Sequence, residues 1–402
     1  MKPNLTTPQA FRSFALGLAL CLAPTIATLT GCSSTGHNKA LQSSEDFDSL
    51  DFATAITVRY AEGFSVDNHS TYKRLTLFNP GSRDTLISYI LYPRNATRPE
   101  LGSGDKLRYI PTPLSTIACA STTELGALAV LGLQERLVAC ASPQNVNDSV
   151  IRQRIERGQV VEIGRGMGRN IEQIIATQPD VYIEDIYSAT DKDADIEASG
   201  IHIVYYNNWK EQHILGRAEW LKVIGLLLGR NAKAQEAYED MVARYEAVRQ
   251  HIAPHIAPAI EIMYGSDYKG VWYVPGEYSY MTRLLADAGI VYDHIPGQLD
   301  SKPMSFEYIY AKHQHKKLWL CMMTGGLDKL EDFVKLNERY PLFEAVRSGQ
   351  VWVDRKRLNA NGGNDFWESG PYNPDLLLKD LVKISRPELL PDYETTYWKR
   401  LE

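Results

Sequence analysis

The stretch NAKAQEAYEDMVARYEAVRQHI, residues 231–252, decides the fold. Its apolar residues recur at steps of three and four, which places them on one face of a helix: Ala234, Ala237, Tyr238, Met241, Tyr245, Val248 and Ile252. Asn231 is a suitable N-cap, Gly229 ends the preceding segment and Pro254 stops the helix. Such a helix would be about 33 Å long. It is either an ordinary surface helix or a spacer between two lobes.

Composition narrows the class of protein. A chain of 402 residues is long for a single core, so we expect two domains. The net charge of −6 argues against a nucleic-acid-binding protein, which would carry a basic excess. The 23 tyrosines and seven tryptophans suit a protein that grips a ligand with flat, amphipathic side chains.

The N-terminus has the features of a targeting segment. Lys2 and Arg12 precede an apolar run from Phe14 to Ala23, and the tetrapeptide LTGC, residues 29–32, follows. This tetrapeptide resembles a bacterial lipobox, which predicts a lipoprotein signal peptide over 1–31, lipidation of Cys32 and a flexible tether over 32–52. A plain secretory signal is the alternative. No later segment is apolar for the length that a membrane span needs, so we expect an exported protein anchored by lipid, on the periplasmic or cell-surface side.

The rest of the chain divides into a β-rich front and an alternating remainder. We predict an antiparallel ribbon of about three strands within 53–110, at Ala55–Tyr60, Tyr72–Phe78 and Asp84–Tyr92. From residue 115 strands alternate with helices, which predicts a largely parallel α/β sheet. The alternation resumes after the long helix. The predicted organisation is a ribbon plus α/β lobe over 53–230, an interlobe helix over 231–252 and a second α/β lobe over 253–402.

Cysteine usage does not indicate a disulfide framework. Cys119, Cys140 and Cys321 remain after the signal peptide, an odd number, and Cys119 and Cys140 lie in apolar runs typical of buried thiols.

Several motifs, in order, resemble the class III solute-binding proteins of bacterial ABC importers, the type that carries iron–siderophores, haem or vitamin B12. They are ASTTEL (120–125) with LGL (131–133), NIE (170–172) with QPDVYI (178–183), YVPG (273–276) and PLF (341–343) with GQVWV (349–353). The resemblance implies two α/β lobes joined by one rigid helix, with cargo held in the cleft between them. It also implies an ABC permease and its ATPase as partners. The ribbon is an addition to the minimal fold and is expected to pack on the first lobe; the alternative is that it lends Tyr60 or Phe64 to the ligand.

The candidate ligand-binding residues lie in loops that follow predicted strands, since open α/β sheets bind ligands at the carboxyl ends of their strands. They are Ser121, Thr122, Arg165, Arg169, Tyr187, Trp209, Trp272, Tyr273 and Trp367. Ser121 and Thr122 begin a helix, where free N–H groups favour an acceptor. The two arginines could pair carboxylates, phosphates or siderophore oxygens. For each aromatic residue, core packing is the alternative.

The resemblance further implies an exposed acid on each lobe that pairs with permease arginines. The matching positions are Glu124 and Glu277. An acid in the first turn of a helix, stabilised by the helix dipole, is the alternative at both positions.

Two other classes of function are disfavoured. A free-metal carrier would need His and carboxylate ligands in the strand-end loops, whereas His313 and His315 are expected to face solvent. An enzyme would show a recognisable motif, and Glu368 has no visible catalytic partner. Because of its two arginines, the predicted cleft favours an iron(III) chelate, siderophore or haem, over a corrinoid. We expect a monomer with no cofactor.

Overall fold

The computed structural model describes residues 49–165, 168–186, 193–268, 270–322 and 327–402. Asp46–Glu402 form one compact unit. The signal peptide, Cys32 and most of the tether lie outside the described residues, as does Tyr187. Within the described part of the chain, no helix is long and apolar enough to cross a membrane.

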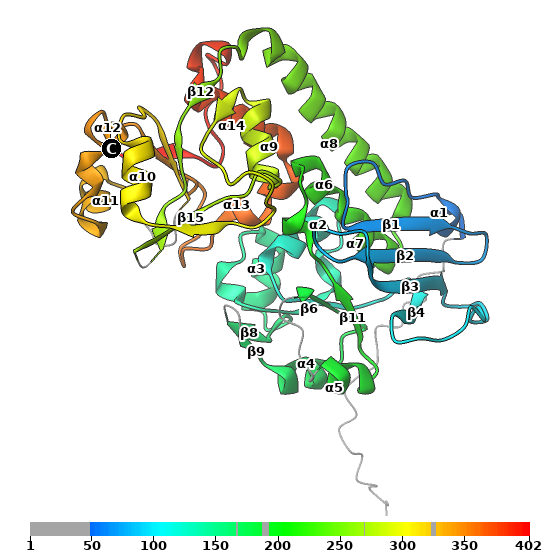
Figure 1. Cartoon of the computed structure of the whole chain (residues 1–402). Coiled ribbons are helices and arrows are strands. Elements are labelled where there is room, and N and C mark those ends of the chain that lie inside the picture. Colours follow the sequence, from blue (N-terminus) through cyan, green and yellow to red (C-terminus); the bar gives the residue numbers. More distant parts are fainter. Residues whose placement is uncertain (1–48, 166–167, 187–192, 269, 323–326) are drawn as a thin grey trace, which may run out of the picture. The chain divides into compact units, whose positions relative to one another are not determined.

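The fold has two α/β lobes, which precede and follow helix α8 (Asn231–Ile252) in the chain (Figure 1). The bounds of α8 are those predicted from the apolar stripe, and the stripe is largely buried. Its start differs from the prediction: Asn231 is inside the helix rather than at its N-cap. The amides of Asn231 and Ala232 instead donate to the carboxylate of Asp51, at 3.0 and 2.9 Å. Asp51 lies in the short helix α1 (Ser49–Ala53), so a distant segment caps α8.

The N-terminal addition is a four-stranded sheet in the order β1-β2-β3-β4. Its strands are β1 (Phe64–Asn68), β2 (Lys73–Phe78), β3 (Thr85–Pro93) and β4 (Leu107–Thr112). Two predicted strands are confirmed in β2 and β3. The predicted antiparallel pairing is found between β1, β2 and β3, and a fourth strand that was not predicted, β4, pairs with β3 in parallel.

The predicted strand at Ala55–Tyr60 is also wrong, because buried carboxylates take up the backbone amides next to it. Glu219 accepts hydrogen bonds from the amides of Arg59, Tyr60 and Ala61, at 3.0, 2.8 and 2.9 Å. Glu211 accepts from the next two amides, those of Glu62 and Gly63, at 2.8 and 2.9 Å. Two acids of the first lobe therefore hold the chain that leads into β1.

The first lobe is built on a five-stranded parallel sheet in the order β11-β10-β5-β6-β7. The strands are β5 (Ile117–Cys119), β6 (Leu137–Cys140), β7 (Val161–Glu162), β10 (Val181–Glu184) and β11 (His202–Tyr205). The connecting helices are α2 (Thr122–Leu131), α3 (Ser149–Glu156), α4 (Ile171–Thr177) and α5 (Asp193–Ala198). Every residue of β10 is buried, as expected for a strand covered on both faces. The predicted alternation is confirmed here.

Three further helices lead from this sheet to the second lobe. They are α6 (Ile214–Glu219), α7 (Leu221–Leu228) and α8. Gly229 ends α7 with a φ of 68°, in the left-handed region that glycine tolerates. In Figure 1, α8 runs from the neighbourhood of α7 and α1 to that of α14 (Pro374–Ser385), and it packs against all three.

The second lobe has a separate core around Trp319. Its main sheet has the order β13-β18-β19-β20, with β13 (Met263–Tyr264), β18 (Trp319–Cys321) and β19 (Val351–Val353) parallel and β20 (Lys399–Arg400) antiparallel. Smaller sheets are formed by β14 (Asp267–Tyr268), β15 (Val271–Val274) and β17 (Lys302–Met304), and by β12 (Ile260–Glu261) and β16 (Ile290–Val291). Its helices include α9 (Tyr280–Asp287), α10 (Phe306–His313), α11 (Leu330–Leu336), α12 (Glu344–Arg347) and α13 (Asp365–Glu368).

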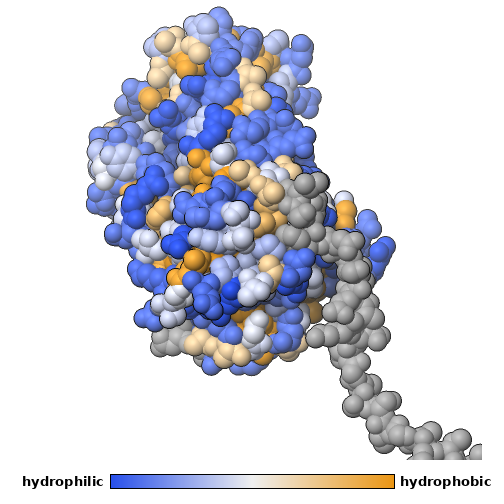
Figure 2. Space-filling model, turned by 90° about the vertical axis from the view of Figure 1, so that its right-hand side faces the viewer, coloured by the Kyte–Doolittle hydropathy of each residue, from blue (hydrophilic) through white to orange (hydrophobic). Residues whose placement is uncertain are grey.

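Three cysteines and one histidine of the described residues are buried. Cys119, Cys140 and Cys321 are free and buried, which confirms the prediction for Cys119 and Cys140. His313 is only 5% exposed, so its predicted solvent-facing position is wrong, whereas His315 is exposed. His313 follows the buried Phe306 and Ile309 at steps of three and four, so it lies on the buried face of α10. The visible face in Figure 2 is mostly hydrophilic, with apolar residues in scattered small groups.

Candidate ligand-binding site

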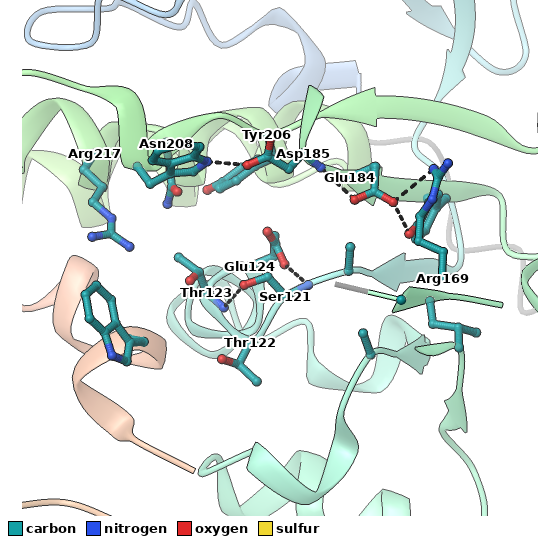
Figure 3. Close-up of a pocket in the computed structure, with 17 residues that line it drawn as sticks. Ser121, Thr122, Thr123, Glu124, Arg169, Glu184, Asp185, Tyr206, Asn208 and Arg217 are labelled. Carbon is teal, nitrogen blue, oxygen red and sulfur yellow. Dashed lines mark hydrogen bonds and ion pairs between the residues drawn. The ribbon is translucent and has the colours of Figure 1, made fainter. Parts of the chain in front are cut away.

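A cavity of about 610 Å³ opens where strands of the parallel sheet end (Figure 3). Loops after β5, β6, β10 and β11 line it, together with residues of α6 and α13. The lining residues are Ala120, Ser121, Thr122, Thr123, Glu124, Ala141, Ile163, Gly168, Arg169, Tyr182, Glu184, Asp185, Tyr206, Asn208, Trp209, Arg217 and Trp367. Its volume is within the range of pockets that hold small molecules, about 300–1,000 Å³. Five of the predicted residues meet here: Ser121, Thr122, Arg169, Trp209 and Trp367.

The N-terminal turn of α2 forms one wall of the cavity. The Ser121 hydroxyl accepts a hydrogen bond from the Thr123 amide at 3.2 Å, and the Glu124 carboxylate accepts one from the Ser121 amide at 2.9 Å. This reciprocal capping box fixes the turn. Burial raises the pKa of Glu124 well above its usual value, and the nearby carboxylates of Glu184 and Asp185 raise it further.

Burial of Glu124 corrects the predicted docking role. The side chain is 5% exposed and caps its own helix. A pair with a permease arginine requires an accessible carboxylate, so Glu124 does not fit that role. Glu277 is exposed, and its carboxylate accepts a hydrogen bond from the Gly297 amide at 2.7 Å.

Both arginines that were predicted to contact the ligand form ion pairs with acids. Arg169 lies within 2.9 Å of Asp193 and 3.2 Å of Glu184, measured from Nη1 to the carboxylate oxygens. Arg165 is exposed, pairs with Glu162 and does not line the cavity, so its ligand contact stays a prediction. The loop sequence alone could not reveal the partners of Arg169, because Glu184 and Asp193 lie 15 and 24 residues further along the chain.

Two tryptophans lie at the cavity with much of their surface accessible. Trp209 is 42% exposed, and its indole N–H donates to the Asp185 carboxylate. Trp367 is 37% exposed. Both face the same cavity from different lobes. Large accessible aromatic rings of this kind provide flat contact area for a ligand.

Trp272 and Tyr273 do not line the cavity. Trp272 is 2% exposed, packs on Trp319 with ring centroids 5.5 Å apart, and donates its indole N–H to the Tyr264 carbonyl at 3.2 Å. Its predicted ligand contact is therefore wrong. Side chains alternate along β15, so Trp272 enters the core while its neighbour Tyr273 is 48% exposed.

Arg217 is a cavity residue that the sequence analysis missed. It lies on α6, is 3% exposed, and its guanidinium stands 4.7 Å from the ring centre of Tyr280 and 5.8 Å from that of Trp367. Its sequence context, ILGRA, was a usable signal, because an arginine in a buried apolar run needs a reason.

A loop of the second lobe forms hydrogen bonds with the first lobe beside this cavity. The Glu368 carboxylate accepts hydrogen bonds from the amides of Asn147 and Asp148, both at 2.7 Å. Asn359 donates to the carbonyls of Gln144 and Val146 at 3.0 and 2.9 Å. The backbone approach is so close that a Cβ at position 363 would lie 2.1 Å from the Asn145 oxygen, which explains the glycine there. The Glu368 carboxylate therefore binds the backbone of the first lobe.

No group of three or more His, Cys, Asp or Glu side chains in the described ranges is placed to hold a metal ion. The cavity instead combines aromatic rings, hydroxyl groups and a few charged groups, the composition of a site for an organic ligand.

A family model described as periplasmic binding protein matches residues 117–358. The chain belongs to this family. The match confirms the family resemblance drawn from the motifs, and β1–β4 lie ahead of the matched range.

Curated relatives in this comparison include two uncharacterized lipoproteins of Methanocaldococcus jannaschii. One is 21% identical over 73% of this chain and 70% of its own length. The other is 22% identical, covering 86% of this chain and 87% of its own length.

Solved structures share the periplasmic binding protein fold. A periplasmic haem-binding protein of Vibrio cholerae aligns with a TM-score of 0.53 at 13% identity, over 68% of this chain and 99% of its own. One from Pseudomonas aeruginosa aligns with a TM-score of 0.52 at 16% identity, over 72% and 98%. A possible iron-binding, periplasmic solute-binding protein of Staphylococcus epidermidis gives 0.52 at 18% identity, over 68% and 100%.

Proposed function

We propose that this protein is the substrate-binding component of an ABC importer, which captures an iron(III) chelate, either a siderophore or haem, and delivers it to a membrane permease. The observation that carries the proposal is the cavity at the strand ends, where Trp209 and Trp367 present accessible rings from two lobes. A flat, bulky ligand held between them would contact both lobes at once.

Family membership and the names of structural relatives support this cargo class. Two of the relatives that share the fold are haem-binding proteins and a third is described as possibly iron-binding. A corrinoid is the alternative cargo within the same family, and it enters the test below as a competitor.

The proposed location is the outer side of a membrane, with the chain anchored by a lipid on Cys32. The LTGC motif supports this anchor, as do the two relatives named lipoproteins.

Glu277 is the docking acid we propose for the second lobe, because its carboxylate is accessible. Glu277→Lys is expected to lower uptake of the cargo by cells while leaving its affinity for the purified protein unchanged. Glu338→Lys, at another exposed acid of the same lobe, is the matched control. Uptake equal to that of the wild type would contradict the docking role.

Fluorescence titration tests the proposed function. Protein carrying Cys32→Ala, which prevents lipid attachment, is titrated with haem, ferric siderophores and cyanocobalamin. One iron chelate is expected to quench tryptophan fluorescence at micromolar concentrations or below, and the Trp209→Ala, Trp367→Ala pair should bind it at least about tenfold more weakly. Tyr278→Ala, at an exposed aromatic residue outside the cavity, should bind like the wild type. Binding of cyanocobalamin alone, or of no compound, would contradict the iron-chelate proposal.

A further inference from the structure

Among the residues that the structure describes, Arg217 is a buried cation with no acid partner. Its side chain reaches the cavity from α6, and the residue is 3% exposed. Within the described residues, its guanidinium makes no hydrogen bond or ion pair, and its buried Nε has no partner. The Tyr280 and Trp367 rings offset part of the cost through cation–π contacts. A buried charge of this kind is otherwise expensive, because it has lost water without gaining a counter-ion.

The other charged groups of the cavity have partners. Figure 3 places Arg217 at one end and Arg169 with Glu184 at the other. Arg169 is held by Glu184 and Asp193. Asp185 accepts the hydrogen bond of the Trp209 indole. Arg217 is therefore the charge in this cavity that a ligand can complement.

We infer that the cargo carries an anionic oxygen group, a carboxylate or its equivalent, which pairs with the Arg217 guanidinium beside the Trp367 ring. This inference rests on the proposed function and specifies the cargo further. A planar guanidinium can donate two parallel hydrogen bonds to a carboxylate, which fixes the orientation of the ligand as well as its charge. The N-terminal turn of α2 lines the same cavity, and its partial positive charge favours an anion too.

The acids that line the cavity are compatible with an anionic ligand. Glu184 is engaged by Arg169 and by the Tyr182 hydroxyl. Burial raises the pKa of both Glu124 and Glu184 above their usual values. Haem, through its propionates, and ferric chelates with a free carboxylate fit this description.

Ligands that differ only in charge test the inference directly. Ferrioxamine B is positively charged, its N-acetyl derivative is neutral and its N-succinyl derivative carries a carboxylate, all on the same iron trihydroxamate core. Haem is measured beside them, with equilibrium affinity as the readout. Among the ligands that bind, the anionic ones are expected to bind about 10- to 100-fold more tightly than neutral ones, the range for a charge-assisted pair.

Substitution of Arg217 should remove that preference. Arg217→Met is expected to lower the affinity for haem or the succinyl chelate about 10- to 100-fold and to leave neutral chelates unchanged, with Arg217→Lys between the two. Arg152→Met, at an exposed arginine of α3 outside the cavity, should bind as the wild type does. Without ligand, the unfolding temperature of Arg217→Met should not fall, because no ion pair is lost.

The outcomes separate this inference from the proposed function. If neutral or cationic chelates bind the wild type as tightly as anionic ones, or if Arg217→Met keeps the preference, the role of Arg217 is overturned while chelate binding stands. If no chelate of any charge binds, the proposed function fails and takes this inference with it. The preference of the wild-type protein among the three ferrioxamines remains decisive even where a variant folds poorly.

Discussion

At the scale of single residues, the partners of the two arginines that line the cavity decide what charge it can bind. Trp209 and Trp367 were recognisable, because large aromatic rings flanked by polar loop residues rarely belong to a core. The ion-pair partners of the arginines were not recognisable from the sequence. Arg169 meets Glu184 and Asp193, which the fold brings to it from β10 and α5. Arg217 looked like part of an apolar helix. The preference for an iron chelate rests on Arg165 and Arg169 in the sequence, whereas both are paired with acids in the structure, and Arg217 carries the charge argument instead.

Glu368 gives the protein a pH-dependent contribution to stability. Burial raises its pKa to about 7, from an ordinary value of 4.5, while hydrogen bonds from the amides of Asn147 and Asp148 oppose the shift. Between these two values the folded protein binds more protons at Glu368 than the unfolded chain does. The free energy of unfolding therefore decreases as pH rises through this window, and the stabilising contribution, fully present below pH 4.5, is lost above about pH 7.

Glu368→Gln does not titrate, so its free energy of unfolding should fall less across this range than that of the wild type. The expected difference between the two changes is at most about 3 kcal/mol. Urea unfolding at several pH values between 4.5 and 8 measures it. Glu338→Gln, at an exposed acid, should follow the wild type. Parallel curves for Glu368→Gln and the wild type would refute the assignment.

At the scale of elements, long periodic segments were predictable and locally ambiguous ones were not. The bounds of α8 follow from its apolar stripe, since the stripe is what the helix buries. Its cap was not predictable, because Asp51 comes from 180 residues away. The same limit explains Ala55–Tyr60, whose β-type residues suggested a strand. Glu219 and Glu211 satisfy the neighbouring amides instead, and no local pattern encodes such a long-range contact.

Glu219 attaches the N-terminal sheet to the first lobe, so substitution of Glu219 measures how much this attachment stabilises the fold. Its carboxylate is fully buried, accepts three backbone hydrogen bonds and pairs with Lys222 at 2.8 Å. Glu219→Ala leaves three amides without an acceptor and the buried Lys222 ammonium without its counter-ion, and is expected to cost about 3–5 kcal/mol of unfolding free energy. Glu239→Ala, which removes the exposed partner of Arg59, should cost about 1 kcal/mol or less. Urea unfolding of both variants decides the point, and similar losses would contradict this account of the attachment.

At the scale of the whole molecule, the family and the two-lobe fold were predictable, and the contacts between the lobes were not. Helix α8 was expected to be the single covalent connection. The loop from Asn359 to Glu368 adds hydrogen bonds to the backbone of residues 144–148, and Lys210 of the first lobe pairs with Asp300 of the second. Motifs identify a family because they recur in order, but contacts between distant loops have no signature of their own.

We propose from these contacts that the lobes close by about 15° or less on binding cargo, since a continuous helix resists bending. Small-angle scattering with and without a bound iron chelate measures the change. The radius of gyration is expected to stay nearly constant. A decrease of several ångströms would contradict a rigid connection.

The most direct test of the central claim is a crystal structure of the protein with an anionic iron chelate bound. The account predicts the chelate in the cavity between Trp209 and Trp367, with a carboxylate oxygen within hydrogen-bonding distance of the Arg217 guanidinium. A chelate bound elsewhere, or one in this cavity that leaves Arg217 without an anionic partner, would contradict it.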